Sequence, residues 1–207
     1  MIDSNSQPGR DHFGFRSYAS KPRWNSYWHQ LDEALELGPS SCLVIGGGDA
    51  VIPQVLRSGG VDVTVSDVVE ELKPDVTADV RDLPFGDREF DVVLCCQVLE
   101  HIPYETVYTA LSELARVASQ RVVISVPDRS RTVAINGQIG RRWSLYRRVT
   151  IAQRDNFEFN GVHYWELGSR NYTTRDFTDV VKRCFSIERA YRVQENPYHH
   201  FFVLSPS

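Results

Sequence analysis

Residues 41–67 read SCLVIGGGDAVIPQVLRSGGVDVTVSD, and this stretch decides the fold. Residues 42–45 form a short apolar run typical of a buried parallel strand, and three consecutive glycines end it. We expect a helix over residues 49–57 and a second strand over residues 61–66, followed by Asp67. This order is typical of a nucleotide-binding site. The glycines leave room for the ligand, the start of the helix offers N–H groups, and the acid binds ribose hydroxyls.

The glycine spacing narrows the type of nucleotide. A dinucleotide fingerprint starting at Gly46 would need glycine at position 51, where Val51 stands. The stretch instead resembles motif I of the class I S-adenosylmethionine (SAM)-dependent methyltransferases, with Gly46 and Gly48 at its glycines and Asp67 at its acid. The resemblance implies a doubly wound, Rossmann-like α/β fold with a seven-stranded, mostly parallel sheet. It also implies that SAM is the cofactor and that these three residues bind it.

A second block extends the resemblance. Residues 78–102 read ADVRDLPFGDREFDVVLCCQVLEHI, which is similar to the small-molecule methyltransferase family that includes ubiquinone and menaquinone biosynthesis enzymes. By this resemblance Asp79 would meet the adenine amino group and the backbone of Val80 would face the adenine ring. Gln97 would lie beside the methionine part of the cofactor and the acceptor. The block therefore implies an enzyme with a small-molecule acceptor.

Composition limits the possible partners. The chain has 207 residues and a formal net charge of −4, which argues against non-specific nucleic-acid binding as its main role. No apolar run approaches the roughly 20 residues that a membrane-spanning helix needs, and the first ten residues lack the apolar stretch of a signal peptide. The four cysteines form no CxxC pair, which favours reduced thiols. We expect a cytoplasmic protein without a membrane partner. The oligomeric state stays open.

The chain divides into two parts by its patterns. We expect residues 1–39 to form an N-terminal tail and a helix, and residues 40–207 to form the methyltransferase domain. The helix is amphipathic and rich in aromatic residues, so it either packs on the sheet edge or also covers the cofactor. Near the C-terminus, residues 185–193 and 200–204 read as two strands joined by a short connection. These strands should be antiparallel and close the sheet.

Residues 128–170 interrupt the pattern and are too long for an ordinary connection. The segment carries six arginines before position 149, interleaved with aromatic residues, and ends in FNGVHYWELG at residues 159–168. It is either a solvated surface or a substrate cover, and we predict a cover. Arginine binds anionic oxygens and aromatic faces bind rings, so we expect a small polar acceptor, a sugar or phosphosugar methylated at a hydroxyl. The residues predicted to bind it are Arg142, Tyr164, Trp165 and Glu166.

Methylation of a hydroxyl requires that its proton be removed. His163, His101 and Glu166 are the candidate bases, and we predict His163 because it lies in the cover among other functional side chains. His101 follows the fourth expected strand, where a structural or cofactor-side role is also open. No spacing of His, Cys and acidic residues predicts a metal site.

Three other readings remain. The sequence LVIGGGD at residues 43–49 also resembles the aminopropyltransferases, which hold a polyamine with acids after the fourth strand. Residues 95–97, which read CCQ, supply no such acid. Val44 and Ala50 stand where the methyltransferase family often has an acid and a third glycine, which would suit an inactive scaffold that serves as a binding module. The arginines of residues 141–148 would suit an RNA methyltransferase, whose binding should depend steeply on salt.

Overall fold

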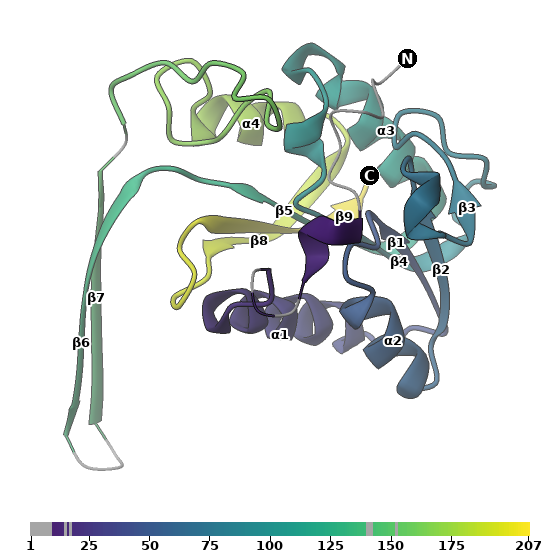
Figure 1. Cartoon of the computed structure of the whole chain (residues 1–207), viewed down its shortest axis with the longest axis horizontal. Coiled ribbons are helices and arrows are strands. Elements are labelled where there is room, and N and C mark those ends of the chain that lie inside the picture. The colour runs from purple at the N-terminus through teal and green to yellow at the C-terminus, as the bar shows by residue number, and fades with distance from the viewer. Residues whose placement is uncertain (1–9, 15, 17, 140–142, 152) are drawn as a thin grey trace.

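The computed structural model describes residues 10–14, 16, 18–139, 143–151 and 153–207. A seven-stranded sheet in the order β3-β2-β1-β4-β5-β9-β8 forms its centre (Figure 1). The first five strands of this order are parallel to one another, and β9 and β8 are antiparallel to their neighbours. The predicted fold class, including the antiparallel C-terminal hairpin, is confirmed. The strands span Ser41–Ile45 (β1), Asp62–Asp67 (β2), Val76–Thr77 (β3), Phe90–Cys96 (β4), Ala118–Pro127 (β5), Phe185–Arg192 (β8) and His199–Pro206 (β9).

Helices cover both faces of the sheet. α1 (Lys21–Leu35) and α2 (Val51–Ser58) lie on one face, and α3 (Val107–Val117) and α4 (Thr174–Val181) lie on the other (Figure 1). Short 3₁₀ helices lie before α1, at Arg10–Phe13 (η2), and between the later elements, at Glu70–Leu72 (η3), Leu99–His101 (η4) and Tyr104–Thr106 (η5). Within the described part of the chain, no helix combines the length and apolar character needed to cross a membrane.

The apolar runs of the central strands contribute to two separate cores. Leu43 of β1 packs into the cluster beneath α3 and α4, whereas its neighbour Val44 packs into the cluster beneath α1 and α2. Successive side chains of a strand point to opposite faces. A strand covered on both sides must therefore be apolar at every position, and this is why residues 42–45 read as a continuous run.

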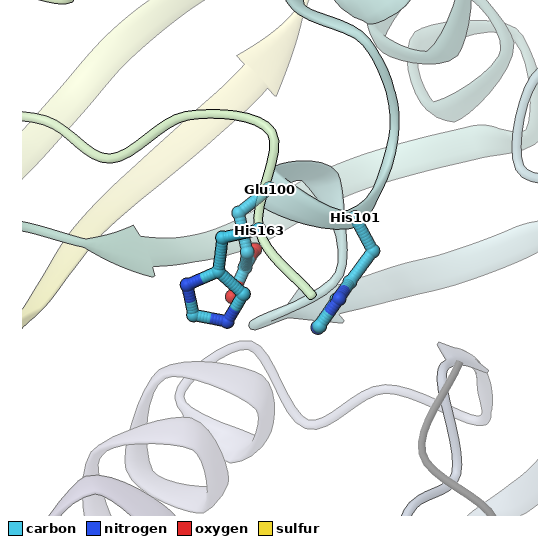
Figure 2. A group of neighbouring side chains, drawn as sticks. All are labelled: Glu100, His101 and His163. Carbon is cyan, nitrogen blue, oxygen red and sulfur yellow. The ribbon is translucent and has the colours of Figure 1, made fainter. Parts of the chain in front are cut away.

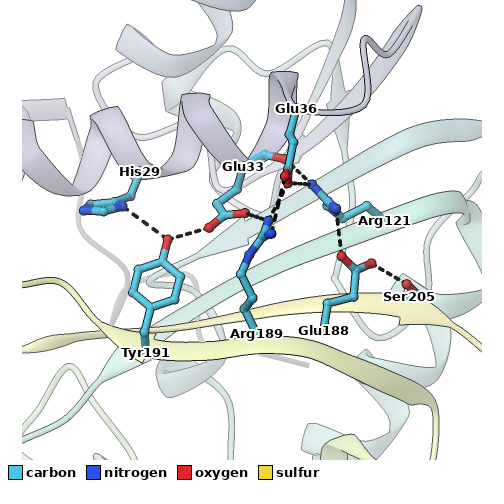
Figure 3. Close-up of polar contacts among 8 residues, drawn as sticks. All are labelled: His29, Glu33, Glu36, Arg121, Glu188, Arg189, Tyr191 and Ser205. Atoms are coloured by element: carbon cyan, nitrogen blue, oxygen red, sulfur yellow. Dashed lines mark hydrogen bonds and ion pairs between the residues drawn. The ribbon is translucent and has the colours of Figure 1, made fainter.

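A network of charged side chains fastens α1 to the sheet (Figure 3). Arg121 of β5 is 4% exposed, and its guanidinium lies 2.7 Å from carboxylate oxygens of both Glu36 and Glu188. Arg189 of β8 pairs with Glu33 and Glu36 at the C-terminal end of α1. Both carboxylate partners of Arg121 reach solvent, whereas Glu33, which pairs with Arg189, is buried. The network therefore fixes the position of α1 with two of its charged groups, Arg121 and Glu33, buried and paired.

The long segment after β5 divides into two structures. β6 (Arg131–Ile139) and β7 (Trp143–Ile151) form a two-stranded antiparallel ribbon, with Val133 opposite Val149. The ribbon extends away from the sheet and the helices (Figure 1). The expectation that residues 128–170 act as one cover therefore needs correction: the ribbon projects outward, and residues 159–168 return to the carboxyl ends of the strands.

Candidate functional site

A pocket lies at the carboxyl ends of the parallel strands, where doubly wound sheets bind ligands. Most of its floor comes from the turn after β1, the end of β2 and the segment after β4. The structure brings five of the six residues predicted to bind the cofactor into this pocket, together with the predicted catalytic histidine. These pocket-lining residues are Gly46, Gly48, Asp67, Val80, Gln97 and His163.

The glycine turn has a backbone conformation that side chains disfavour. Gly46 has φ +74° and Gly48 has φ +49°, values in the left-handed region that glycine adopts most readily. A Cβ on Gly46 would come within 2.5 Å of a methyl carbon of Val98, and a Cβ on Gly48 would lie 3.4 Å from the ring of Phe13. The turn therefore leaves a cradle that additional side-chain atoms would fill.

Asp67 stands at the end of β2 and lines the pocket. Its Oδ1 accepts a hydrogen bond of 2.9 Å from the backbone N–H of Val69, which fixes the orientation of the carboxylate. Burial raises the pKa of Asp67 above its usual range, although hydrogen bonds from backbone N–H groups, including those of Val69 and Gly47, oppose this shift. The carboxylate is thus poorly hydrated and able to form strong bonds to ligand hydroxyls.

Asp79 is the predicted cofactor residue that does not line the pocket. Its neighbours Ala78 and Val80 do, while the carboxylate of Asp79 binds the guanidinium of Arg81 at 2.6 Å. Burial raises the pKa of Asp79, but the bonds to Arg81 outweigh burial and the net shift is downward. A contact between Asp79 and an adenine ring would require this ion pair to rearrange.

His163 faces the pocket with a carboxylate behind it. Its Nδ1 lies 2.8 Å from Oε1 of Glu166, and since a carboxylate only accepts, Nδ1–H is the donor. The hydroxyl of Tyr198 donates to the same oxygen at 2.8 Å. Burial lowers the pKa of His163, but the bond to Glu166 and the nearby charge of Glu100 outweigh burial and raise it. Glu166 is 7% exposed and positions His163 from behind instead of lining the pocket.

The loop that carries His163 is shaped by its own sequence. The side-chain oxygen of Asn160 accepts hydrogen bonds from the backbone N–H groups of Val162 (3.0 Å) and His163 (2.8 Å). Gly161 between them has φ +94°, so asparagine and glycine together form the turn. The backbone N–H of Tyr164 then donates to the carbonyl of Glu100 at 2.8 Å. These bonds hold the loop against η4 and turn His163 toward the pocket.

The other predicted acceptor-binding residues lie elsewhere. Trp165 is fully buried, and its indole N–H donates to the carbonyl of Ile102 at 3.1 Å. Tyr164 packs against Phe159, with ring centroids 4.6 Å apart, and does not line the pocket. Arg142 lies outside the described residues. The structure therefore corrects the prediction for Trp165, which anchors the loop to the core and has no surface to offer an acceptor.

Sequence reasoning missed Glu100, which lines the pocket beside His163 (Figure 2). Its side chain is fully buried, and both carboxylate oxygens lack a hydrogen-bond partner. Burial raises the pKa of Glu100 to about 7. His101, the next residue, donates from Nδ1 to the carbonyl of Val162 at 3.1 Å, and burial lowers its pKa to about 4. The motif VLEHI contained both residues, but a sequence does not show that a glutamate is buried without a partner.

The N-terminal helix supplies a further wall. Arg23 of α1 lines the pocket together with Tyr18, and the guanidinium of Arg23 lies 3.8 Å from the centroid of the Tyr18 ring. The hydroxyl of Tyr27 donates to the carboxylate of Asp49 in the glycine turn at 2.6 Å. Of the two readings of this helix, packing on the sheet or also covering the pocket, these contacts favour the second.

Comparison with known proteins agrees with this geometry. Residues 43–125 match the family model of the methyltransferase domain. No curated protein sequence shows a significant match to the chain.

The solved structures most similar in fold include several methyltransferases. A 1,6-didemethyltoxoflavin N1-methyltransferase from Burkholderia thailandensis, with bound S-adenosylhomocysteine, has a TM-score of 0.60 and 18% identity over 96% of this chain and 87% of its own. The N-methyltransferase NodS from Bradyrhizobium japonicum, also with S-adenosylhomocysteine, has a TM-score of 0.61 and 12% identity over 94% and 92% of the two chains. The magnesium protoporphyrin IX methyltransferase from Synechocystis has a TM-score of 0.55 and 18% identity over 96% and 98%.

These findings define the class of protein. The matched domain spans the glycine turn and the block of residues 78–102, on which the resemblance depends. The likeness to solved structures shows the fold. The prediction of a SAM-dependent methyltransferase with the class I fold is therefore confirmed, and SAM is the cofactor of this class.

Proposed function

We propose that the chain methylates a hydroxyl of a small polar acceptor that binds on the His163 side of the pocket. The observation that carries this proposal is that His163, with Glu166 behind it, opens into the same pocket as Gly48 and Asp67. One cavity thus combines a cradle for the cofactor with a side chain that can accept a proton.

The residues of the pocket fit SAM. The backbone at Gly46 and Gly48 leaves space for a ligand, the carboxylate of Asp67 suits the ribose hydroxyls, and Val80 offers an apolar contact for a ring. When bound, SAM supplies an electrophilic methyl group, and its transfer to a hydroxyl oxygen releases S-adenosylhomocysteine and a proton. The chain must hold the acceptor in line and remove that proton.

His163 is suited to the proton transfer. Because Nδ1–H is held by Glu166, the neutral ring has its lone pair on Nε2, which can accept a proton from a hydroxyl. The carboxylate of Glu166 then stabilises the imidazolium that forms. Tyr198, bound to the same carboxylate, keeps Glu166 in place. His163 is thus the proposed catalytic residue, and Glu166 and Tyr198 are its positioning residues.

A sugar or phosphosugar remains the proposed acceptor class. Its support is the polar lining of the acceptor side, where Arg23, Glu100, His163 and Tyr198 offer both donors and acceptors of hydrogen bonds. The arginine on this wall is Arg23 from α1. Among the described residues, the arginines of the segment 128–170 do not line the pocket. An apolar quinone would leave these polar groups without partners, which is costly in a buried site.

The test is a screen for SAM-dependent product with sugar nucleotides, phosphosugars, quinols and small amines. On a hydroxyl acceptor, His163→Ala should lower kcat by about 10²- to 10⁴-fold and leave the affinity for SAM nearly unchanged. Trp28→Ala, which alters an exposed ring of α1 that does not line this pocket, serves as the control. Turnover confined to quinols or amines, or wild-type rates in His163→Ala, would contradict the proposal.

A further inference from the structure

A cluster of metal-ligating side chains lies on the acceptor side of the pocket. Glu100, His101 and His163 each offer one ligand atom, and these atoms all lie within 4.8 Å of one another. Figure 2 shows the three side chains converging from two segments, η4 and the loop of residues 159–168. The rings of His101 and His163 meet nearly edge to face, with centroids 5.0 Å apart. Three potential ligands, two from η4 and one from the loop, thus lie close together in the pocket wall.

The carboxylate of Glu100 indicates that something binds there. It is fully buried and lines the pocket, and neither oxygen has a hydrogen-bond partner among the described residues. Burying an unpaired carboxylate costs several kcal/mol or more, so buried carboxylates in native proteins are normally paired or bind a metal. No cationic side chain is paired with Glu100 among the described residues. A bound cation would satisfy it.

The two histidines are oriented as metal ligands usually are. His101 donates from Nδ1 to the carbonyl of Val162, and His163 donates from Nδ1 to the carboxylate of Glu166. In each neutral ring the free lone pair is therefore on Nε2. Metal-ligating histidines are typically held in this way by a carbonyl or carboxylate on the other nitrogen, which fixes the tautomer and the direction of the ring.

We propose that Glu100, His101 and His163 form a binding site for a divalent transition-metal cation beside the methyl-transfer position. Two imidazoles and one carboxylate are the ligand set that suits zinc or iron(II), and it leaves coordination positions for an outside oxygen. Magnesium and calcium prefer oxygen ligands alone and suit this set poorly. The ligand set of this site therefore favours zinc or iron(II) over magnesium or calcium.

The cation would give the acceptor side a specific chemistry, and this part of the inference rests on the proposed function. A divalent cation lowers the pKa of bound water from about 15.7 to about 7, and it acidifies a bound hydroxyl in the same sense. The acceptor proton would then leave to solvent, and the oxygen would form the new C–O bond while the methyl–sulfur bond breaks with its electron pair on sulfur. His163 would act as a ligand in this form and as the base only when the cation is absent.

The site can be tested by binding alone. The 207-residue chain is treated with a chelator and freed of it. It is then titrated with Co²⁺, followed by visible absorption spectroscopy, and with Zn²⁺ in competition. We expect a single Co²⁺ per chain, with d–d absorption and no thiolate charge-transfer band, displaced by Zn²⁺. Glu166→Gln should weaken binding by about 10- to 100-fold, and Glu100→Gln and His163→Ala by about 100-fold or more, because they remove ligands. Cys96→Ala removes a pocket-lining thiol and should bind like the wild type.

The outcomes separate this inference from the proposed function. Affinity for S-adenosylhomocysteine shows that each variant is folded, since the cofactor residues are unchanged. Absence of Co²⁺ binding by folded wild type, or equal binding by wild type, Glu100→Gln and His163→Ala, would overturn the metal site. Methyl transfer at full rate after chelator treatment, without Zn²⁺ binding, would overturn the metal site and leave the proposed function intact. Co²⁺ binding as described, with no methyl transfer to any acceptor, would overturn the proposed function and leave the metal site intact.

Discussion

Replacement of Asp67 by asparagine tests the cofactor side of the pocket directly. Asparagine has nearly the same shape as aspartate and keeps a side-chain oxygen. In the native protein the backbone N–H of Val69 donates a hydrogen bond of 2.9 Å to Oδ1 of Asp67, and the oxygen of asparagine can accept the same bond. The substitution therefore removes the charge and leaves the local backbone bond available. We expect the fold to be preserved and the affinity for the cofactor to fall.

The size of the loss follows from the surroundings of Asp67. Burial has already raised the pKa of this carboxyl group, so its charge is poorly hydrated before a ligand arrives. Hydrogen bonds from ribose hydroxyls to Asp67 therefore displace little water. Hydrogen bonds to charged groups contribute about 1.5–3 kcal/mol, which corresponds to an affinity loss of about 10- to 150-fold at 25 °C.

The assay is calorimetric titration with S-adenosylhomocysteine, which binds without reacting. Asp62→Asn is the matched control, because Asp62 is an exposed acid at the other end of the same strand and does not line the pocket. It removes the same charge and should leave the affinity unchanged. If Asp67→Asn and Asp62→Asn bind with the same affinity as the wild type, Asp67 does not hold the cofactor.

Three further variants test the turn, the carboxyl end of β5 and the anchor of α1. Gly48→Val should abolish calorimetric binding of S-adenosylhomocysteine, because it forces a branched side chain into a left-handed conformation within the cradle; retained binding would contradict the cradle. Burial opposes ionisation of Asp128, but hydrogen bonds from His200 and Ser130 outweigh it and hold its pKa at about 2. Its contribution to stability should be complete above about pH 4 and disappear as the pH falls toward 2, and acid unfolding of Asp128→Asn should lack this component. Arg121→Met should lower the free energy of unfolding in urea by about 1–3 kcal/mol, because the buried carbonyl of Glu33 loses its hydrogen-bond donor while Glu36 and Glu188 can return to water; an unchanged midpoint would show that the network of Figure 3 contributes no stability.

The cofactor half of the site could be predicted because its signals are local. The apolar run at residues 42–45, the glycine turn and the acid at Asp67 follow one another in sequence, and each reflects the conformation of its own backbone. Helix α2 begins two residues later than expected, because Ala50 adopts a left-handed conformation before the first turn. Such an offset at an element boundary does not alter the pocket.

The ribbon of β6 and β7 could not be predicted from the same signals. Val133, Ile135, Val149 and Ile151 are all more than half exposed, so the alternation of apolar residues there does not mark a face turned toward the core. The interleaved arginines suggested a surface that binds an acceptor. Composition alone does not distinguish a segment that covers a pocket from one that pairs with itself and projects outward.

The acceptor half depends on contacts between distant parts of the chain, and these decide which residues of a motif are available for chemistry. Trp165 and His163 are separated by one residue in the same loop, yet the ring of Trp165 is in the core while His163 faces the pocket. The difference arises because the indole N–H of Trp165 donates to the buried carbonyl of Ile102, whereas the side chain of Asn160 holds the backbone of His163 so that its ring faces the pocket. The family pattern carries Glu100 but not His163, so the sequence resemblance describes the cofactor side well and leaves the acceptor side to residues that only folding brings together.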